Sequence, residues 1–469
     1  MNHGSSDRVA DDLRTWIAAA APGARLPSTR ELTVRHAVSP VTVQRALRAL
    51  SAEGLVETRP GVGAFVRAPR TVRAHDYSWQ TAALGAAGPA RSAASAALRT
   101  PSAELISLHS GYPDRELLPE RAVRAALARA ARGDAALVRT PSAGLLELRT
   151  WFAAELAEQT PARYTAPSAR DVIVLPGSQL GLGAAFRSIA GPGGSLLVES
   201  PTYWGAILAA AQVGVSLVPV PTGPAGPDLV ALDRAFTETG ARGFYAQPTY
   251  ANPTGAQWSQ AHGEAVLDLV RAHGAFLVED DWAHDFGITT HAAPLAARDD
   301  GGHVVYLRSL TKSVSPAIRV AALVARGPVH ERLLADLEAQ SMYVSGALQA
   351  AALDVVTQPA WQSHLRGLAR RLRARRDLLV DAVTAHLPGA TIEAVPPGGL
   401  NLWVRLPDGT DLARLIRDAE ARGVVVASGD DWFPAEPTGR YLRLNFAGPD
   451  PGAFGRAAEL LAEAMGEQG

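Results

Sequence analysis

The chain has 469 residues, of which 47% are hydrophobic and 19% charged, and its formal net charge at pH 7 is −1. This length exceeds one hydrophobic core, so two or three domains are expected, and the balanced charge excludes a nucleic-acid or membrane partner recognised by overall charge alone. The sequence has no cysteine, no basic and apolar leader and no run of about 18 apolar residues. These absences exclude disulfides, thiolate catalysis and cysteine-based zinc sites, and they predict a cytoplasmic protein without a membrane partner.

The first 68 residues are predicted to form a winged helix-turn-helix domain. Apolar residues at helical spacing predict a helix over residues 7–20, and Ser28 and Ser39 are good N-caps for two more, the second over residues 41–53. Residues 55–58 and 64–66 then read as two short strands around a glycine-containing turn. Residues 1–73 hold 11 arginines against six acidic residues, a local net charge of +5.

This order of elements suits DNA, because the second helix of the pair enters the major groove and the hairpin lies along the backbone. Polar side chains near the start and on the exposed side of that helix are candidates for base or phosphate contacts, and two further arginines are phosphate candidates. These DNA-binding candidates are Thr42, Gln44, Arg45, Arg48, Arg30 and Arg59. A protein-interaction module or an arginine-rich solvated face is the alternative.

The amino-acid sequence of this region resembles the GntR-type winged-helix DNA-binding domain, with each element at the expected spacing. The resemblance is carried by residues 26–32, 38–47, 53–56 and 61–66. The resemblance implies double-stranded DNA as a partner. Residues 69–103 change to Ala, Ser, Gly, Pro and Arg without periodicity, which predicts a flexible linker.

From residue 104 onward, the pattern predicts an α/β fold with a mostly parallel sheet. Apolar runs at residues 172–175, 195–198, 276–278 and 304–307 alternate with helical stretches, as buried parallel strands do. We expect a large domain over residues 104–330. Residues 331–469 are predicted to form a helical and α+β C-terminal subdomain, with short strands around residues 402–404 and 442–444.

Polar motifs follow several of these strands at their C-terminal ends, where open α/β sheets bind ligands. Residues 175–181 leave a strand and open a helix, which suits a phosphate at a helix N-terminus. Residues 252–255 form an Asn-Pro-Thr-Gly turn, although this motif is also an ordinary β-turn. Residues 278–281 end a strand in acidic side chains, for which a helix cap or, with His284 nearby, a metal site is the alternative; we predict no metal.

The fourth motif contains Lys312, the only lysine among 45 basic residues. Arginine replaces lysine wherever charge is enough, but a guanidinium stays protonated and does not react as an amine. A chain that uses arginine everywhere else therefore suggests a nucleophilic amine at this position. Chance survival of one lysine in a biased composition is the alternative.

These residues meet the needs of pyridoxal 5′-phosphate (PLP). Lys312 supplies the amine for the aldehyde, and a carboxylate, for which we choose Asp280, faces the protonated pyridine nitrogen. Tyr203 is placed above the ring, unless it is simple core packing, and Asn252 donates to the phenolate O3′. The phosphate is expected to bind helix-terminal amides and Ser178, Gln179, Ser309 and Arg319.

Together, the motifs resemble a fold-type I aminotransferase of the aminoadipate or kynurenine type, and with the GntR-type front the whole chain resembles the MocR-like transcriptional regulators. The resemblance implies a homodimer. It assigns the substrate carboxylate to Arg443, for which an interdomain ion pair is the alternative, and it places Tyr112 and Asn401 on the substrate side. Trp282 stands where these regulators have a tyrosine that donates to O3′; its N–H is a donor too, but it cannot ionise.

We therefore expect a PLP-dependent, DNA-binding transcriptional regulator that senses an amino acid or amine, or PLP itself, through an aldimine at Lys312. The alternative is an active aminotransferase, which converts an amino acid to a 2-oxo acid, with an appended DNA-binding domain.

Overall fold

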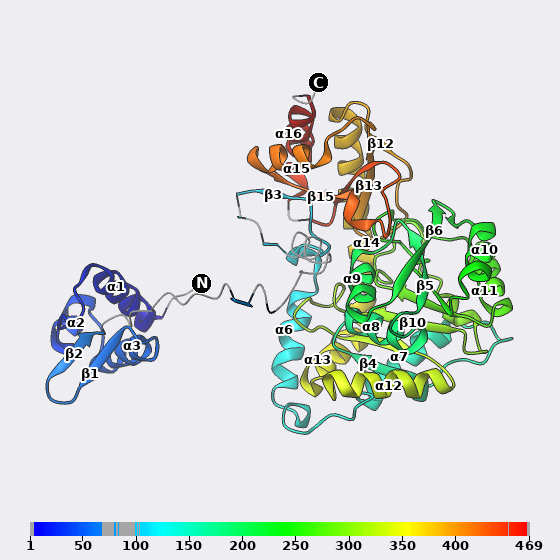
Figure 1. The fold of residues 1–469 in the computed structure, drawn as a ribbon. Coiled ribbons are helices and arrows are strands. Elements are labelled where there is room, and N and C mark those ends of the chain that lie inside the picture. The colour runs from blue at the N-terminus through cyan, green and yellow to red at the C-terminus, as the bar shows by residue number, and fades with distance from the viewer. Residues whose placement is uncertain are drawn as a thin grey trace. The chain divides into compact units, whose positions relative to one another are not determined.

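The computed structural model describes residues 4–67, 79–80, 83, 99–100, 102, 104–448 and 450–466. The chain separates into two compact units, residues 1–87 and residues 88–469, which we describe one at a time (Figure 1). The linker predicted for residues 69–103 lies almost entirely outside the described residues.

The N-terminal unit is a winged helix-turn-helix. It consists of three helices and a hairpin: α1 (Ser5–Ala19), α2 (Thr29–His36), α3 (Pro40–Ala52), β1 (Val56–Arg59) and β2 (Gly63–Val66), with the two strands antiparallel. The prediction for this region is confirmed.

Side-chain caps explain where the second and third helices begin. The Ser28 hydroxyl accepts from the backbone N–H of Glu31, whose carboxylate accepts from the N–H of Ser28 in return, and Ser39 accepts from the N–H of Thr42. The apolar faces of the helices and the hairpin then share one small core. It contains Val9, Leu13, Leu32, Val43, Leu47, Leu50, Val56 and Val66.

The C-terminal unit is built on an eight-stranded, mostly parallel sheet. Its strand order is β4-β11-β10-β9-β8-β5-β6-β7, and β11 and β7 run antiparallel to their neighbours. The strands are β4 (Val172–Leu175), β5 (Ser195–Ser200), β6 (Ser216–Gly223), β7 (Gly226–Pro227), β8 (Gly243–Ala246), β9 (Phe276–Asp281), β10 (Val304–Ser309) and β11 (Ala321–Val324). All four apolar runs that predicted parallel strands lie in this sheet, although β4 pairs only with antiparallel β11.

Helices cover both faces of this sheet, as a sheet buried on both faces requires (Figure 1). One face packs against α8 (Ser178–Ile189), α9 (Trp204–Val213) and α12 (Pro328–Ser341). The other face packs against α6 (Glu120–Ala130), α7 (Leu146–Glu158), α10 (Leu229–Thr239), α11 (Gln260–Ala272) and α13 (Gly346–Thr357). Helix α12 thus belongs to the core on one face of the large sheet, and α13 to the core on the other face. The boundary between the large domain and the C-terminal subdomain, predicted at residue 330, stays a prediction.

A second core holds the C-terminal part, together with residues 106–117. It is built from α14 (Ala360–His386), α15 (Leu412–Ala421), α16 (Phe454–Gly466) and an antiparallel sheet of β12 (Thr391–Ile392), β13 (Asn401–Leu406), β15 (Ala427–Ser428) and β16 (Arg440–Asn445). Strand β3 (Ile106–Ser107) pairs with β14 (Val424–Val425) beside it. Short 3-10 turns lie at residues 115–117, 134–136, 169–171, 295–298, 429–432 and 451–453.

The fold class predicted from the sequence is confirmed: a winged helix followed by an α/β unit with a smaller α+β part. None of the helices in the described part of the chain is long and apolar enough to cross a membrane.

Candidate functional site

One cavity collects the polar residues at the C-terminal ends of the sheet strands. Ten of its twelve lining residues were predicted from the sequence. These ten are Tyr112, Ser178, Gln179, Tyr203, Asn252, Asp280, Trp282, Ser309, Lys312 and Arg319, and the remaining two are Gln247 and Thr311. Segments separated by more than 200 residues therefore meet at one edge of the sheet.

Lys312 lies just after β10, with its amine against aromatic rings. The Nζ atom is 4.7 Å from the ring centroid of Trp282 and 5.8 Å from that of Tyr112. Burial lowers the pKa of Lys312 from 10.5 to about 8, although the nearby Asp280 carboxylate opposes this shift. A substantial fraction of the amine is therefore neutral near pH 8 and able to attack a carbonyl carbon.

Asp280, near the end of β9, keeps one carboxylate oxygen free for a ligand. Its Oδ2 accepts from the hydroxyl of Tyr245 at 2.9 Å and from Nε2 of Gln247 at 2.8 Å. Its Oδ1 is buried and has no hydrogen-bond partner among the residues described. Burial raises the pKa of Asp280, and a cationic N–H donor facing Oδ1 would satisfy the orphaned oxygen and stabilise the ionised form.

The junction between β4 and α8 forms an anion-binding end of the cavity. Gly177 precedes α8 with a φ of +92°, and a Cβ on it would lie 2.6 Å from Nη2 of Arg319. Glycine at this position therefore lets the guanidinium of Arg319 approach the free N–H groups of the helix N-terminus. Ser178 opens the helix, and Ser309 faces the same cavity from β10. Such an arrangement suits a phosphate group.

The amide of Asn252 is oriented by two donors from the C-terminal part of the unit. Its Oδ1 accepts from Nε1 of Trp432 at 3.2 Å and from Nη1 of Arg443 at 3.3 Å. Both contacts hold the oxygen, so the NH2 group points away from these donors and is available as a donor itself.

Arg443 is almost fully buried behind Asn252 and does not line the cavity itself. Its Nη2 donates to the carbonyl of His109, and its guanidinium carbon lies 4.8 Å from the ring centroid of Trp432. Burial lowers its pKa to about 10, so it remains charged at neutral pH. Its Nε is buried without a hydrogen-bond partner in the described structure.

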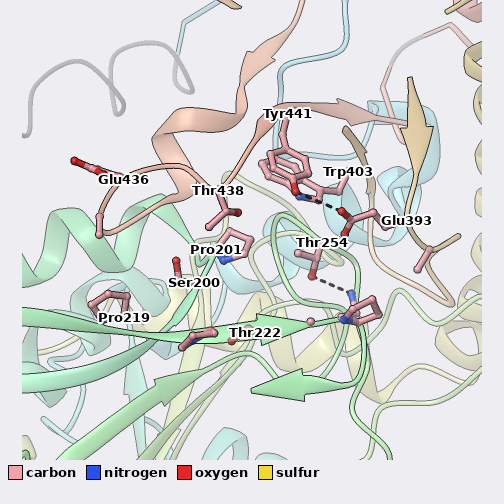
Figure 2. Close-up of a pocket in the computed structure, with 16 residues that line it drawn as sticks. Ser200, Pro201, Pro219, Thr222, Thr254, Glu393, Trp403, Glu436, Thr438 and Tyr441 are labelled. Atoms are coloured by element: carbon pink, nitrogen blue, oxygen red, sulfur yellow. Dashed lines mark hydrogen bonds between the residues drawn. The ribbon is translucent and has the colours of Figure 1, made fainter. Parts of the chain in front are cut away.

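A second cavity, of about 410 Å³, borders these residues (Figure 2). Its walls include Pro201 and Pro219 on one side and Trp403 and Tyr441 on the other, and the two aromatic rings stack at 4.7 Å. Thr254 also lines it and follows Asn252 by two residues, so this side cavity adjoins the first one along the chain. The lining combines prolines and aromatic rings with hydroxyl groups and with the carboxylates of Glu393 and Glu436, so it can take a ligand group that has both apolar and polar parts.

On the N-terminal unit, the predicted DNA-binding residues lie mainly on the exposed side of α3 and around it. Gln44, Arg45 and Arg48 are exposed on α3, and Arg30 is exposed on α2. Thr42, by contrast, is half-buried, and its hydroxyl hydrogen-bonds to that of Ser39 at 2.9 Å.

Arg59 lies at the end of β1, beside the hairpin turn. Its side chain donates to Glu57 at 3.1 Å and covers the ring of Phe65. Arg25, which the sequence did not single out, holds the turn by donating to the carbonyl of Val62 at 2.7 Å.

Comparison with known proteins shows which families the two parts of the chain match. Residues 103–461, well over half of its length, match the family described as aminotransferase class I and II. The chain belongs to that family. Residues 5–66 of this aminotransferase-family chain match a second family, the bacterial regulatory proteins of the gntR family, so its N-terminal unit is a DNA-binding domain.

Relatives of this aminotransferase-family chain share both parts. The chain is 27% identical over 434 residues to the HTH-type transcriptional regulator YdfD of Bacillus subtilis, covering 91% of this chain and 88% of the relative. It is also 27% identical over 453 residues to the probable rhizopine catabolism regulatory protein MocR of Rhizobium meliloti, covering 94% and 89%. The protein is thus a transcriptional regulator with an aminotransferase-like domain.

Among solved structures, the α-aminoadipate aminotransferase of Thermus thermophilus, in complex with N-(5′-phosphopyridoxyl)-L-leucine, is similar. It is 25% identical, with a TM-score of 0.73 over 83% of this chain and 98% of that chain. The cofactor of the aminotransferase-family domain is PLP, and the cavity fits it. The free Oδ1 of Asp280, the amine of Lys312 and the anion-binding end match its pyridine nitrogen, aldehyde and phosphate.

One predicted side-chain role does not agree with the geometry of this aminotransferase-family domain, and a second side chain is partly engaged in other contacts. The indole N–H of Trp282 donates to the carbonyl of Tyr250 at 3.1 Å, so Trp282 faces Lys312 with its ring and has no donor left for O3′. The Gln179 side chain is also engaged, because its Nε2 donates to Gly205 at 2.7 Å and its Oε1 accepts from the hydroxyl of Tyr203 at 3.3 Å. One N–H of Nε2 and the backbone N–H of Gln179 remain for a phosphate.

Asn401, Glu279 and Asp281 take part in the packing instead. Asn401 is buried at the start of β13, paired across the sheet with Asn445, and does not line the cavity. Glu279 accepts from two backbone N–H groups and Asp281 from the hydroxyl of Tyr306. No group of three or more metal-binding side chains occurs in the described ranges.

Proposed function

We propose that the DNA affinity of this transcriptional regulator depends on an amino compound that binds at the PLP site of Lys312. The observation that carries this proposal is the cavity itself: the only lysine of the chain, with a lowered pKa, faces a buried free carboxylate oxygen and an anion-binding helix end. In this proposal the cavity binds the amino compound, and the winged helix binds DNA with an affinity that changes as a result.

When bound, PLP supplies an electrophilic carbon and an electron-withdrawing ring. In this proposal Lys312 would hold the cofactor through its amine, and Asp280 would face the ring nitrogen and favour its protonated form. Asn252 would donate to the ring oxygen through its NH2 group, and the ring of Tyr203 would pack against the cofactor. Ser178, Ser309 and Arg319 would bind the phosphate together with the N–H groups of α8.

The recognition of the effector is assigned to the residues around Asn252. Arg443 is the only guanidinium that contacts Asn252 within the described residues, and an unpaired Nε adds to its capacity for a carboxylate. Tyr112 lies beside Lys312, and the side cavity with Trp403 and Tyr441 accommodates the rest of the effector.

We propose a homodimer as the DNA-binding form, so that two copies of α3 meet two half-sites. Gln44, Arg45 and Arg48 would read or contact DNA from α3, with Arg30 and Arg59 on the phosphates. Because its partner is DNA, we place the protein in the cytoplasm. The effector has to bind more tightly to one of two dimer arrangements, since only such a difference shifts an equilibrium.

An absorbance screen of amino acids and amines against the holoprotein tests this function. A compound that changes the cofactor absorbance is expected to change the mobility shift of DNA from the upstream region of the gene. Lys312→Arg is the control, which should bind DNA but show neither response. If every compound that alters the absorbance leaves DNA binding unchanged, the proposed function is wrong.

Arg443→Lys tests the kind of effector. A lysine loses the two-point contact to a carboxylate, so the response to an amino acid should become about 10- to 100-fold weaker. The response to the corresponding amine without a carboxylate should stay nearly unchanged. Absorbance titrations of both ligands measure the two affinities, and an equal loss for both would contradict the assignment.

The second candidate is an active aminotransferase, favoured by the neutral amine that Lys312 provides near pH 8. In that reaction Lys312 would carry a proton between two carbons after being displaced. Multiple turnovers with an amino donor and a 2-oxo acid acceptor would establish it. A single absorbance change without turnover would exclude it.

A further inference from the structure

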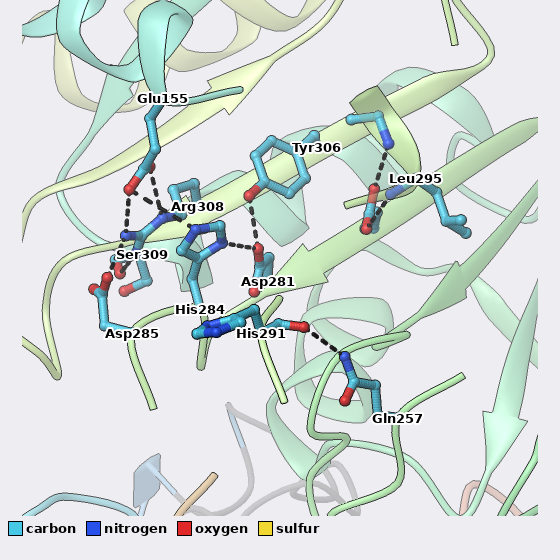
Figure 3. Close-up of polar contacts among 12 residues, drawn as sticks. Glu155, Gln257, Asp281, His284, Asp285, His291, Leu295, Tyr306, Arg308 and Ser309 are labelled. Atoms are coloured by element: carbon cyan, nitrogen blue, oxygen red, sulfur yellow. Dashed lines mark hydrogen bonds and ion pairs between the residues drawn. The ribbon is translucent and has the colours of Figure 1, made fainter. Parts of the chain in front are cut away.

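A buried ion network lies behind the cofactor cavity, on the opposite face of the sheet (Figure 3). Side chains alternate along a strand, so Asp280 and Ser309 point to one face and Asp281 and Arg308 to the other. Arg308 is 1% exposed. It donates twice to Glu155 of α7, at 3.0 Å each.

The same guanidinium connects this network to the lysine segment. Arg308 donates to Asp285 at 2.8 Å and to the carbonyl of Ser309 at 2.7 Å. Ser309 begins the segment that ends in Lys312 and itself lines the cofactor cavity. Any group that competes for Asp285 or Glu155 therefore acts on the position of Ser309.

His284 belongs to the same network through contacts with Asp281 and Glu155. Its Nδ1 lies 2.5 Å from Oδ2 of Asp281, and its Nε2 is 3.8 Å from Glu155. Burial and Arg308 lower the pKa of His284, but these two carboxylates raise it by more, so the net shift is upward. Three carboxylates, those of Glu155, Asp281 and Asp285, thus contact Arg308 or His284. Glu158 and Arg366 line the cavity beside them.

A cavity of about 660 Å³ opens onto this network, between α7, α13, α14 and the loop after β9. We call it the rear cavity; its lining includes Trp151, Trp361, Glu155, Glu158 and Asp285. The side chain of Asp285 is only 3% exposed, and its Oδ2 has no hydrogen-bond partner in the part of the chain that the structure describes. A buried, unpaired carboxylate oxygen beside a cavity is costly unless a donor occupies that cavity.

We propose that the rear cavity binds a small organic cation with N–H donors and an apolar part. The cationic end would donate to the free Oδ2 of Asp285 and lie near the Glu158 carboxylate, while the two tryptophans would contact the apolar part. This site is separate from the PLP cavity and does not depend on which amino compound binds there. An occupant that binds Asp285 would change the contacts of Arg308, and through the bond from Arg308 to the Ser309 carbonyl it would shift the segment that carries Lys312.

Calorimetry with benzamidine tests the site, because an amidinium does not react as an amine with the cofactor. The holoprotein is first reduced with borohydride, which ties PLP permanently to Lys312 and closes the first site to exchange. We expect one molecule of benzamidine to bind per chain. An absence of binding to the reduced holoprotein would overturn the proposal.

Three variants on α7 locate the binding. Ala154→Trp fills the rear cavity from an exposed position of the helix and should abolish binding. Glu158→Gln removes one exposed carboxylate and should weaken binding about 5-fold. Glu147→Gln, an exposed glutamate in the first turn of the same helix, is the matched control and should bind normally. Undiminished binding in Ala154→Trp would place the ligand elsewhere and refute the site.

The connection to the lysine is tested with unreduced holoprotein. Saturating benzamidine should shift the cofactor absorbance of the wild type and of Glu147→Gln, but not that of Ala154→Trp. Because benzamidine carries no amine for the PLP site, this readout is separate from the effector screen. Binding without any absorbance shift would contradict the modulation through Arg308.

Discussion

At the scale of the single residue, Lys312 shows why lysine and arginine are not interchangeable. The 44 other Lys or Arg positions are all arginine, which supplies charge and directional N–H donors but no reactive amine. Lys312 needs a neutral amine, and burial against Trp282 and Tyr112 lowers its pKa to about 8. Asp280 opposes this shift, so the two residues set the reactivity of the site together.

The pH dependence of cofactor capture is the first prediction. Below the pKa the amine is protonated and cannot attack, so the rate of colour formation in apoprotein should rise with pH, with a midpoint near the pKa of about 8 and a plateau well above it. Asp280→Asn removes the carboxylate that raises the pKa of Lys312, and the midpoint should move to lower pH. Stopped-flow absorbance across a pH series measures both midpoints.

Asp268→Asn, on an exposed part of α11, serves as the control and should keep the wild-type midpoint. A wild-type midpoint near 10.5, the value of an unburied lysine, would show that burial does not tune the amine.

At the scale of the element, the junction of β4 and α8 determines the anion-binding end. The strand ends at Leu175, Gly177 turns the chain with a positive φ, and α8 starts at Ser178 with its free N–H groups toward the cavity. Arg319 also has a positive φ of 52°, and its side chain occupies the space that a Cβ on Gly177 would need. The two positions are therefore constrained together.

Gly177→Ala is the prediction at this scale. The added methyl group would displace the guanidinium of Arg319 and strain the turn, so the affinity for PLP should fall at least about 10-fold. Gly193→Ala is a matched control, since its φ of +78° is also positive but no atom lies within 4 Å of the added Cβ. The control should lose about 1 kcal/mol of stability without weaker PLP binding. Fluorescence titration of apoprotein with PLP compares them, and equal affinities would refute the constraint.

At the scale of the whole molecule, each of the two units has its own hydrophobic core. The N-terminal core comprises residues between Val9 and Val66. The two cores on the faces of the large sheet comprise residues between Val123 and Trp361, so they share no residue with the N-terminal core. A change on the exposed side of α3 should therefore affect DNA binding alone.

Arg45→Ala should weaken specific DNA binding about 10- to 100-fold, because one good base contact is removed. PLP absorbance and the response to an effector should stay as in the wild type. Arg8→Ala, which removes an exposed arginine of α1, is the control for a general loss of positive charge. Mobility shifts and absorbance titrations of the same samples test the separation, and a lost chromophore in Arg45→Ala would contradict it.

The sequence by itself determined the fold class, the helix caps of Ser28 and Ser39, and ten of the twelve residues that line the PLP cavity. These were predictable because periodicity, capping and strand-end motifs are local, and the C-terminal ends of parallel strands meet at one edge.

Only the tertiary structure decided which donors are already used and which residues support the site from elsewhere. The N–H of Trp282 binds the Tyr250 carbonyl, Gln247 reaches Asp280, and Trp432 holds Asn252 from 180 residues away. The hydrogen bonds of Arg308 on the opposite face of the sheet are also contacts that only the tertiary structure reveals. Such contacts depend on packing between distant segments, and the local sequence pattern carries no record of which partner a side chain meets.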